Sequence, residues 1–193
     1  MTSELTVEER LLDATLEVAA DHGISRLSVG DVAKRAGLSR QTLYKHFASR
    51  DDLVSRTVLR EAGRIVEQVI AAAVLHDDPV ASIEAAILET LRLVRGHPLL
   101  DRLVATEPEV LLPLLIGGPW GVLGAIRDIS KQIIEERVPG ATGPESSSAA
   151  DLLSRMLISY TVRSPDQPPE EVAHFLSTAI VAGLTTAPTP AHR

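Results

Sequence analysis

The segment from Leu27 to Leu53, which reads LSVGDVAKRAGLSRQTLYKHFASRDDL, constrains the fold more than any other part of this chain. Ser28 is typical of a helix N-cap, because its hydroxyl can accept a free amide proton in the first turn. Gly37 supplies the left-handed backbone that ends a helix at little cost. Ser39 then repeats the N-cap signal. The segment therefore predicts two short helices, one ending before Gly37 and one beginning after Ser39.

Apolar residues support both predicted helix starts. Leu27 can pack against Val32 and Leu38 against Leu43, an arrangement that fixes the angle at which a chain enters a helix. The second helix is expected over Arg40–Phe47. Two short helices joined by a tight turn form a helix-turn-helix, and in DNA-binding proteins the second helix of this motif enters the major groove.

Charge is distributed unevenly along the chain. No Asp or Glu occurs from Val32 to Arg50, although the whole chain has a formal net charge of -7. The first 64 residues hold ten basic and ten acidic side chains, so the other nine basic and sixteen acidic ones carry all the excess. Basic charge confined to one part of an acidic protein favours directed binding of a polyanion. An ordinary helical hairpin with a solvated basic side is the simpler alternative. The acid-free stretch contains Lys34, Arg35, Arg40, Lys45 and Arg50.

Several of these features also match a known family. An opening helix that ends in His22-Gly23, the run LSVGDVAKRAGLS, and the run TLYKHF followed by SRDDL occur in this order. In these features the stretch from Glu8 to Leu59 resembles the DNA-binding domain of the TetR family of bacterial transcriptional regulators. The resemblance implies a three-helix, homeodomain-like helix-turn-helix domain that binds double-stranded DNA. Arg50 stands where many members carry lysine, and either cation can hold a phosphate.

The first exposed side chains of the second helix are the candidates for reading a DNA sequence. Arg40 can bridge the O6 and N7 atoms of guanine, Gln41 can address adenine, and Thr42 can meet a thymine methyl group or a phosphate. The resemblance implies sugar-phosphate contacts for the polar residues that follow and for the starts of the neighbouring helices. Tyr44 could equally be half-buried packing with its hydroxyl exposed, and His46 an ordinary surface histidine. The complete predicted set is Ser28, Ser39, Arg40, Gln41, Thr42, Tyr44, Lys45, His46 and Arg50.

Helical periodicity continues along the rest of the chain and predicts an all-α fold of about nine helices. A capping box of Thr6 with Glu9 opens the first helix. Ser49 opens a long fourth helix that runs toward His76, so this helix is expected to leave the DNA-binding domain and link it to the rest. The stretch 139–148, rich in Gly, Ser and Pro, is expected to be a loop.

The chain is therefore expected to have two domains. Residues 1–50 are expected to form the helix-turn-helix domain, and residues 51–186 a helical domain for ligand binding and dimerisation. Residues 187–193, which include Pro188 and Pro190, are expected to form a disordered tail.

The last two predicted helices carry apolar stripes at i, i+3, i+4 and i+7 spacing, which suits pairing between helices. Ala179 and Gly183 are small residues four positions apart, so a neighbouring helix could approach closely there. Two helices from each chain can form a four-helix bundle around a two-fold axis, although packing inside one subunit is the alternative. The resemblance favours a homodimer, because the last two helices usually form the dimer interface in the TetR family. The predicted interface residues are Leu153, Leu157, Phe175, Ala179 and Gly183.

The C-terminal part is apolar enough to enclose a small molecule. We expect a ligand-gated repressor, in which a small apolar effector shifts the long fourth helix and changes the separation of two DNA-binding domains on a palindromic operator. Aromatic residues make up 3% of the chain, which favours aliphatic over stacked planar contacts. Residues of this kind are more often plain core than ligand contacts. The candidates are Leu103, Leu114, Trp120, Leu123 and Tyr160.

The sequence lacks the residue patterns that other chemistries need. There is no cysteine, which excludes disulfides, thiolate metal sites and a cysteine nucleophile. The six histidines have no metal-ligand spacing and there is no glycine-rich phosphate loop, so no metal, cofactor or catalytic residue is expected. Pro and Gly interrupt the uncharged run Val110–Ile126, so no membrane partner is expected, and the expected location is cytoplasmic.

The competing interpretations are an enzyme or a helical small-molecule-binding protein without a role on DNA, and a helical adaptor that binds protein.

Overall fold

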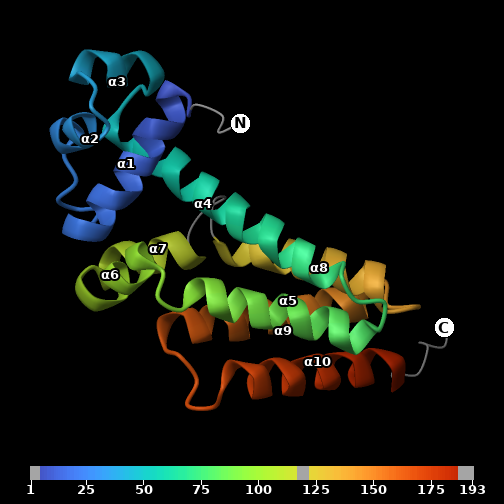
Figure 1. The fold of residues 1–193 in the computed structure, drawn as a ribbon. Coiled ribbons are helices and arrows are strands. Elements are labelled where there is room, and N and C mark those ends of the chain that lie inside the picture. Colours follow the sequence, from blue (N-terminus) through green and yellow to red (C-terminus); the bar gives the residue numbers. More distant parts are fainter. Residues whose placement is uncertain (1–4, 117–121, 187–193) are drawn as a thin grey trace. The chain divides into compact units, whose positions relative to one another are not determined.

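The computed structural model of the protein describes residues 5–116 and 122–186, and these residues form ten helices (Figure 1). No strand occurs among them, and the predicted all-α fold is confirmed. None of these helices has both the length and the apolarity needed to span a bilayer. Trp120 and the predicted tail 187–193 lie outside the described residues. The helices are α1 Val7–His22, α2 Val29–Arg35, α3 Arg40–His46, α4 Arg50–Ala73, α5 Pro79–Val94, α6 Pro98–Thr106, α7 Pro108–Ile116, α8 Val122–Arg137, α9 Gly143–Val162 and α10 Pro169–Thr186.

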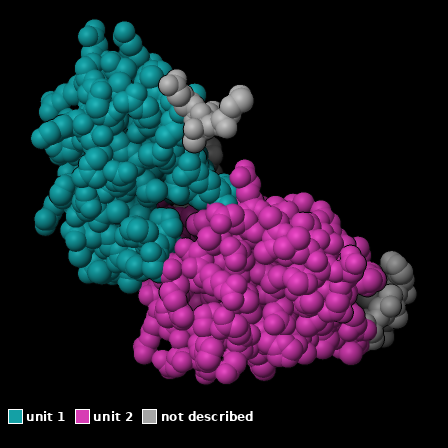
Figure 2. Space-filling view, in the orientation of Figure 1, with its two compact units in different colours: residues 1–64, 96–112 teal, residues 65–95, 113–193 magenta. Residues whose placement is uncertain are grey.

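The helices divide between two compact units, which Figure 2 distinguishes by colour. Unit 1 comprises residues 1–64 and 96–112, and unit 2 comprises residues 65–95 and 113–193. The long fourth helix is present as predicted, with 24 residues, and the boundary between the units falls inside it. The predicted domain limits, residues 1–50 and 51–186, stay predictions.

In unit 1, capping residues and a glycine turn determine where the helices begin and end. Thr6 and Glu9 make the predicted capping box at α1, in which the Glu9 carboxylate accepts the Thr6 amide at 2.7 Å. Gly37 follows α2 with a positive φ of 67°, and the next amide, of Leu38, bonds back to the Ala33 carbonyl at 2.8 Å. These ends bring the apolar faces of α1, α2, α3 and α4 into one core. Its most deeply buried large side chains, each at most 1% exposed, include Leu11, Val18, Val32, Leu43, Phe47 and Leu53.

Unit 2 is built from longer helices that lie along one another. α5 packs along α10, and α8 packs along α9 (Figure 1). Their inward faces share a single apolar cluster that also takes in Val69 and Ala73 from the end of α4. Burial of this apolar cluster makes the largest favourable contribution to the packing of these helices. The largest buried members of the cluster include Ile83, Ile87, Leu91, Ile133, Ile134, Leu153 and Leu157.

The predicted loop over residues 139–148 is wrong in its second half, because α9 already begins at Gly143. Pro144 stands in the first turn of this helix, where its missing amide proton costs nothing. Ser146 is fully buried, and its hydroxyl lies 2.7 Å from Oε1 of Glu135 and 3.0 Å from the Gly143 carbonyl oxygen. Ser and Pro are common in loops but also at helix starts, and composition alone could not separate the two.

Candidate nucleic-acid interface

The helix-turn-helix is positioned by the two predicted N-caps. The Ser28 hydroxyl accepts the Asp31 amide at 3.1 Å at the start of α2. The Ser39 hydroxyl accepts the Thr42 amide at 3.0 Å at the start of α3. Each cap satisfies one of the amide groups that a helix start leaves without a partner. Both short helices therefore begin at the residues that the sequence indicates.

One face of α3 is buried in unit 1 and the rest of the helix faces solvent. Leu43 and the following Phe47 are almost fully buried and anchor α3 to the core. Tyr44 is 55% exposed, so its role as a backbone contact and its role as half-buried packing with an exposed hydroxyl both stay predictions. The other predicted contact residues of α3 share this outer surface. Arg40, Gln41, Tyr44, Lys45 and His46 are exposed, and Thr42 is half-buried.

Two of the five cations in the acid-free stretch are already engaged inside unit 1. Arg35 pairs with Glu17 at 3.0 Å and with Asp21 at 2.8 Å. The bond with Asp21 raises the pKa of the guanidinium, and the same bond lowers the pKa of the Asp21 carboxyl. In the part of the chain that the structure describes, Lys34, Arg40 and Lys45 take part in no ion pair. We call these three the free cations, and they carry the unpaired positive charge that the acid-free stretch can offer to a polyanion.

Arg50 is the second engaged cation, and it holds the loop between α1 and α2. Its Nε atom donates to the Leu27 carbonyl oxygen at 2.9 Å, and a terminal nitrogen donates to the Ile24 carbonyl oxygen. Its other terminal nitrogen pairs with Asp51 at 3.0 Å. The predicted phosphate contact of Arg50 stays a prediction, because it has to compete with these bonds. Carbonyl partners more than twenty positions away leave no signal in the sequence.

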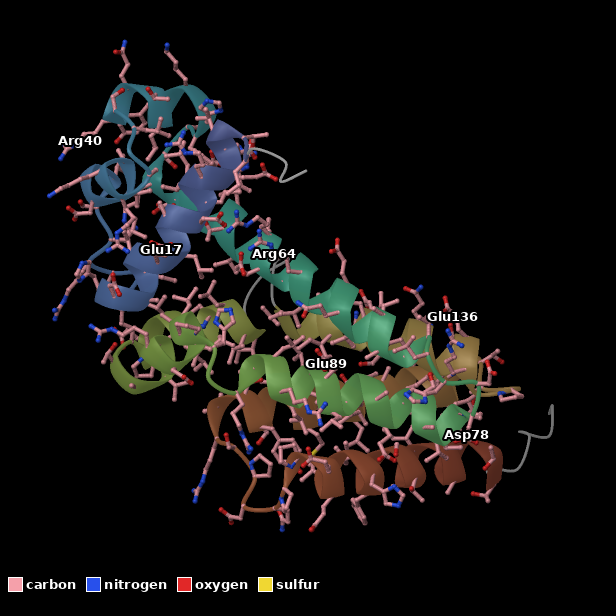
Figure 3. The ribbon with its side chains drawn as sticks, viewed as in Figure 1. Glu17, Arg40, Arg64, Asp78, Glu89 and Glu136 are labelled. Carbon is pink, nitrogen blue, oxygen red and sulfur yellow. The ribbon has the colours of Figure 1, made fainter. Side chains whose placement is uncertain are left out.

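The side chain of Arg40 lies against Gly30 of α2, in space that a larger residue there would fill. A Cβ atom built on Gly30 would lie 2.2 Å from a terminal nitrogen of Arg40 and 2.8 Å from the central guanidinium carbon. The guanidinium therefore lies against the backbone of α2, and Figure 3 shows the side chain of Arg40 on that side of α3. Glycine inside a helix is unfavourable relative to alanine. The contact with Arg40 gives Gly30 a structural purpose that the sequence did not reveal.

A second arginine ties the end of α3 to α4. Arg56 lies over the ring of Phe47, with its guanidinium carbon 4.8 Å from the ring centroid. It also donates to the carbonyl oxygen of His46 at 3.2 Å and pairs with Glu8 of α1. These contacts join the last residue of α3, the first helix and α4 through one side chain. No signal in the sequence marks Arg56, because its partners come from two other segments, α1 and the end of α3.

The residues one and two turns further along α4 extend this link toward α1. Arg60 pairs with Asp13 of α1 at 2.8 Å and with Glu61 at 3.0 Å. Arg64, labelled in Figure 3, lies 3.8 Å from the same Asp13 and 3.0 Å from Glu61. Arg60 and Glu61 are largely buried, at 17% and 14% exposed side-chain area, so water screens them less than a surface pair. Within unit 1, the orientation of α3 is thus coupled to α1 and α4 by charge as well as by packing.

The predicted effector residues lie in different places. Leu103 is buried in unit 1, whereas Leu114, Leu123 and Tyr160 are half-buried in unit 2. Trp120 lies outside the described residues. Tyr160 packs against the apolar cluster of unit 2. The individual assignments of an effector contact therefore stay predictions.

A groove of about 630 Å³ lies between α8 and α9 in unit 2. Its walls carry both signs of charge, and Arg127 and Arg155 pair with their neighbours Asp128 and Asp151 at 2.8 Å and 2.7 Å. This polar surface does not resemble the aliphatic pocket expected from the sequence. The full lining is Arg127, Asp128, Lys131, Ser147, Ser148, Asp151, Leu152 and Arg155.

The predicted dimer residues divide into a buried and an exposed group. Leu153 and Leu157 are each only 5% exposed and belong to the core of unit 2. Phe175 is 71% exposed, and Ala179 and Gly183 follow it on α10 at intervals of four residues, also exposed. The sequence stripe thus combines residues that hold the subunit together with residues that stay available to a partner.

Sequence profiles of bacterial regulators match both parts of the chain. The profile described as bacterial regulatory proteins, tetR family, matches residues 11–57. The profile described as bacterial tetracyclin repressor, C-terminal domain, matches residues 78–182. The first match spans the helix-turn-helix, and the second spans most of unit 2.

Individual relatives agree with these profiles. An uncharacterised HTH-type transcriptional regulator of Mycobacterium tuberculosis is 33% identical over 103 residues, which make up 53% of this chain and 51% of that protein. Among solved structures, the TetR family repressor AlkX from Dietzia, implicated in biodegradation of n-alkanes, has a TM-score of 0.71 at 23% identity. That match covers 95% of this chain and 97% of AlkX. The regulator FadR from Bacillus subtilis, in complex with stearoyl-CoA, has a TM-score of 0.63 at 16% identity, over 90% and 97% of the two chains. Both structures are similar in fold.

Proposed function

Because this chain belongs to the TetR family of bacterial regulatory proteins, we propose that it is a transcriptional repressor that binds a palindromic operator as a homodimer. The proposal rests on the side chains that the outer surface of α3 exposes to solvent. It offers Gln41 and two of the free cations, Arg40 and Lys45, to solvent, on a helix fixed by its cap and by its buried leucine. A helix of this kind fits the major groove of double-stranded DNA.

The contacts with DNA follow from the chemistry of these side chains. Arg40 and Gln41 stand in the first turn of α3, where they can present paired hydrogen-bonding groups to guanine and to adenine. Lys45 is a point charge one turn later, which suits a phosphate better than a base. Together with Lys34 it supplies affinity that depends on salt rather than on sequence. The partner is chromosomal DNA, so we place the protein in the cytoplasm.

A second copy of the chain is the proposed partner of α10. Phe175 offers a large apolar side chain, while Ala179 and Gly183 let the backbone of another helix approach closely. A two-fold pair of subunits presents two copies of α3 to half-sites separated by about 34–36 Å or a multiple of it. Without the pair, only one half-site is held and specific affinity falls.

We propose a long aliphatic molecule as the effector. The named relatives concern n-alkanes and stearoyl-CoA, and the cluster of unit 2 is lined by partly buried aliphatic side chains such as Leu88, Ile126 and Ile129. Leu114, Leu123 and Tyr160 remain the candidate contacts from the sequence. The effector releases the operator only if it binds the conformation that does not fit DNA more tightly than the conformation that does.

The DNA-binding proposal is tested by fluorescence anisotropy with a labelled duplex from the region upstream of the protein's own gene. We expect binding that weakens steeply with salt, and stronger binding to this duplex than to a scrambled one of equal length. Absence of binding at low salt would reject the proposal. Equal affinity for both duplexes would reject a specific operator in that region.

The effector proposal has its own test. Fatty acids and acyl-CoA esters of increasing chain length are added to the protein while its melting temperature is followed. Longer chains should raise the melting temperature and release the duplex at the same concentrations. If no chain length raises the melting temperature while the duplex still binds, the proposed effector class is wrong and the DNA-binding proposal stands.

A further inference from the structure

Glu107, the residue between α6 and α7, is the one ionisable side chain that is buried among the residues the structure describes, at 6% exposed. Removing a carboxylate from water is strongly unfavourable unless hydrogen bonds replace the lost solvent. Its surroundings therefore have to supply donors. The donors come from a part of the chain more than eighty residues away.

The backbone of the loop after α1 provides them. The amide of Ile24 donates to Oε2 of Glu107 at 2.8 Å, and the amide of Ser25 lies 3.3 Å from each carboxylate oxygen. Gly23 has a positive φ of 86°, and a Cβ atom built on it would lie 2.2 Å from Oε1 of Glu107. Only glycine combines this backbone angle with so close an approach. We call the Glu107 carboxylate and the two amides the Glu107 clasp.

The same loop is held from its other side by Arg50. Glu107 accepts from the amides of Ile24 and Ser25, whereas Arg50 donates to the carbonyl oxygens of Ile24 and Leu27. The next residue, Ser28, is the N-cap of α2. A negative and a positive side chain thus fix both kinds of backbone group in the short loop that sets where α2 begins. Since α2 packs on α3, the loop also influences the position of the proposed reading helix.

We propose that Glu107 is a positioning residue for operator binding, acting through the loop that joins α1 to α2. This inference rests on the proposed function and adds to it a residue outside the helix-turn-helix. Segment 96–112, which carries Glu107, belongs to unit 1 by its contacts but is preceded and followed along the chain by segments of unit 2. The Glu107 carboxylate accepts hydrogen bonds from the amides of this loop directly. A displacement of α6 relative to α1 therefore has to move the loop or break the Glu107 clasp.

The test compares three variants by operator affinity, melting temperature and dimer content. Glu107→Ala removes both acceptors, Glu107→Gln keeps one acceptor oxygen at the same volume, and Glu109→Ala removes an exposed acid two positions away as a matched control. We expect Glu107→Ala to lose operator affinity on the order of tenfold while binding to a scrambled duplex stays unchanged. Glu107→Gln should recover part of the loss, and Glu109→Ala should match the parent protein.

A double-mutant cycle separates the clasp from a general loss of stability. Gly23→Ala places a methyl group against the carboxylate in the parent protein, and the Glu107→Ala background removes this clash while the strain of the positive φ remains in both. Gly23→Ala should therefore reduce operator affinity less in that background than in the parent. Strictly additive losses, or a Glu107→Ala variant with parental operator affinity, would overturn the proposal.

Hydrogen exchange distinguishes failure of the clasp from failure of the proposed function. The amide protons of Ile24 and Ser25 should exchange faster in Glu107→Ala and at the parental rate in Glu109→Ala. If the parent protein binds no operator, the proposed function fails whatever the exchange rates are. If the parent binds and neither amide changes its exchange rate, the clasp is wrong.

Discussion

Units 1 and 2 are stabilised by different kinds of contact. In unit 1, Arg50, Arg56 and Glu107 each bond to backbone groups of other segments, and the bonds of Arg50 and Glu107 are partly or fully buried, whereas that of Arg56 is exposed. In unit 2, two polar pairs that cross between helices, Arg92 with Glu170 and His174 with Glu84, lie at the surface. The buried Ser146 bonds to Glu135 between α9 and α8, and otherwise an apolar cluster fills most of the interior.

The difference reflects what each kind of contact can specify. Hydrogen bonds are directional and fix the orientation of the groups they join. Apolar burial is roughly proportional to area and tolerates small displacements of the packed surfaces. A helix that has to match base edges needs fixed orientation, so directional contacts belong in unit 1. The proposed effector would have to enter a core that is stable without a single rigid geometry, and the apolar packing of unit 2 fits that proposal.

The largest expected effect uses the two phenylalanines of the chain, Phe47 in unit 1 and Phe175 in unit 2. Phe47 is 1% exposed, and Phe47→Ala should cost about 3–5 kcal/mol of unfolding free energy because it leaves a cavity in a small core. Phe175 is 71% exposed, and Phe175→Ala should change the free energy of unfolding of the separated subunit by only about 0.5 kcal/mol. Urea unfolding at low protein concentration measures both values.

The dependence of apparent stability on protein concentration tests the same comparison of Phe47 with Phe175. If Phe175 lies at the dimer interface, the apparent stability of the parent protein should rise with concentration and that of Phe175→Ala should rise less. A Phe175→Ala variant that loses as much stability as Phe47→Ala at every concentration would show that α10 is covered within the subunit. The two units would then not differ in the way described above.

The next effect concerns two free cations on α3. Arg40→Ala should weaken operator binding by about 1–3 kcal/mol and relax the preference at one base pair, because a paired contact with a guanine is lost. Lys45→Ala should weaken binding to all sequences and lower the salt slope by about one, as loss of a phosphate contact does. Anisotropy titrations over a range of salt concentrations, with single-base operator variants, measure both effects.

The control for this pair comes from unit 2. Arg92 is 56% exposed and pairs with Glu170, so Arg92→Ala removes the same charge far along the chain from the helix-turn-helix. It should leave both the affinity and the salt slope at their parental values. If Arg40→Ala and Lys45→Ala alter specificity and salt slope alike, the division between base contact and phosphate contact is wrong.

The sequence was most informative where structure depends on neighbours along the chain. The caps at Ser28 and Ser39, the capping box at Thr6 and the turn at Gly37 all involve partners within a few residues. A side chain and an amide three positions apart meet in nearly every helix start, so residue type and spacing are sufficient evidence. The family resemblance then supplied the assignment to a family, which both profile matches confirm.

The sequence was least informative where a polar side chain bonds to a remote backbone group. Nothing near Glu107 indicates that it accepts the amide of Ile24, and nothing near Arg50 indicates that it is occupied by carbonyl groups. Periodicity likewise could not tell that Leu153 is core while Phe175 is exposed, because both belong to regular apolar stripes. Counting charges overestimated the cations available to DNA for the same reason, since the partners of Arg35 lie on another helix.

A smaller effect concerns the glycine beside Arg40. Gly30→Ala should stabilise unit 1 by about 0.5–1 kcal/mol, because alanine has the higher helix propensity. The same methyl group displaces the Arg40 guanidinium, so the preference at the base pair read by Arg40 should change. Gly63→Ala is the matched control, because a Cβ atom on this glycine of α4 meets no atom within 4 Å. If both variants gain stability and neither changes specificity, the position of Arg40 over α2 has no role in recognition.

The smallest effect tests whether exposed polar bonds contribute to unit 1 at all. The hydrogen bond from the Thr6 amide is the main cause that lowers the pKa of the Glu9 carboxyl. A carboxyl whose pKa is lowered by folding stabilises the protein above its ordinary pKa, and this contribution is lost as the pH falls through about 4.3 and below. Glu9→Gln should therefore melt slightly below the parent at pH 7, and the two melting temperatures should converge by about pH 3. If the melting temperatures of the parent and of Glu9→Gln differ by the same amount at both pH values, Glu9 stabilises the protein through packing rather than through its charge. Among the hydrogen bonds of unit 1, only the buried ones would then contribute to its stability.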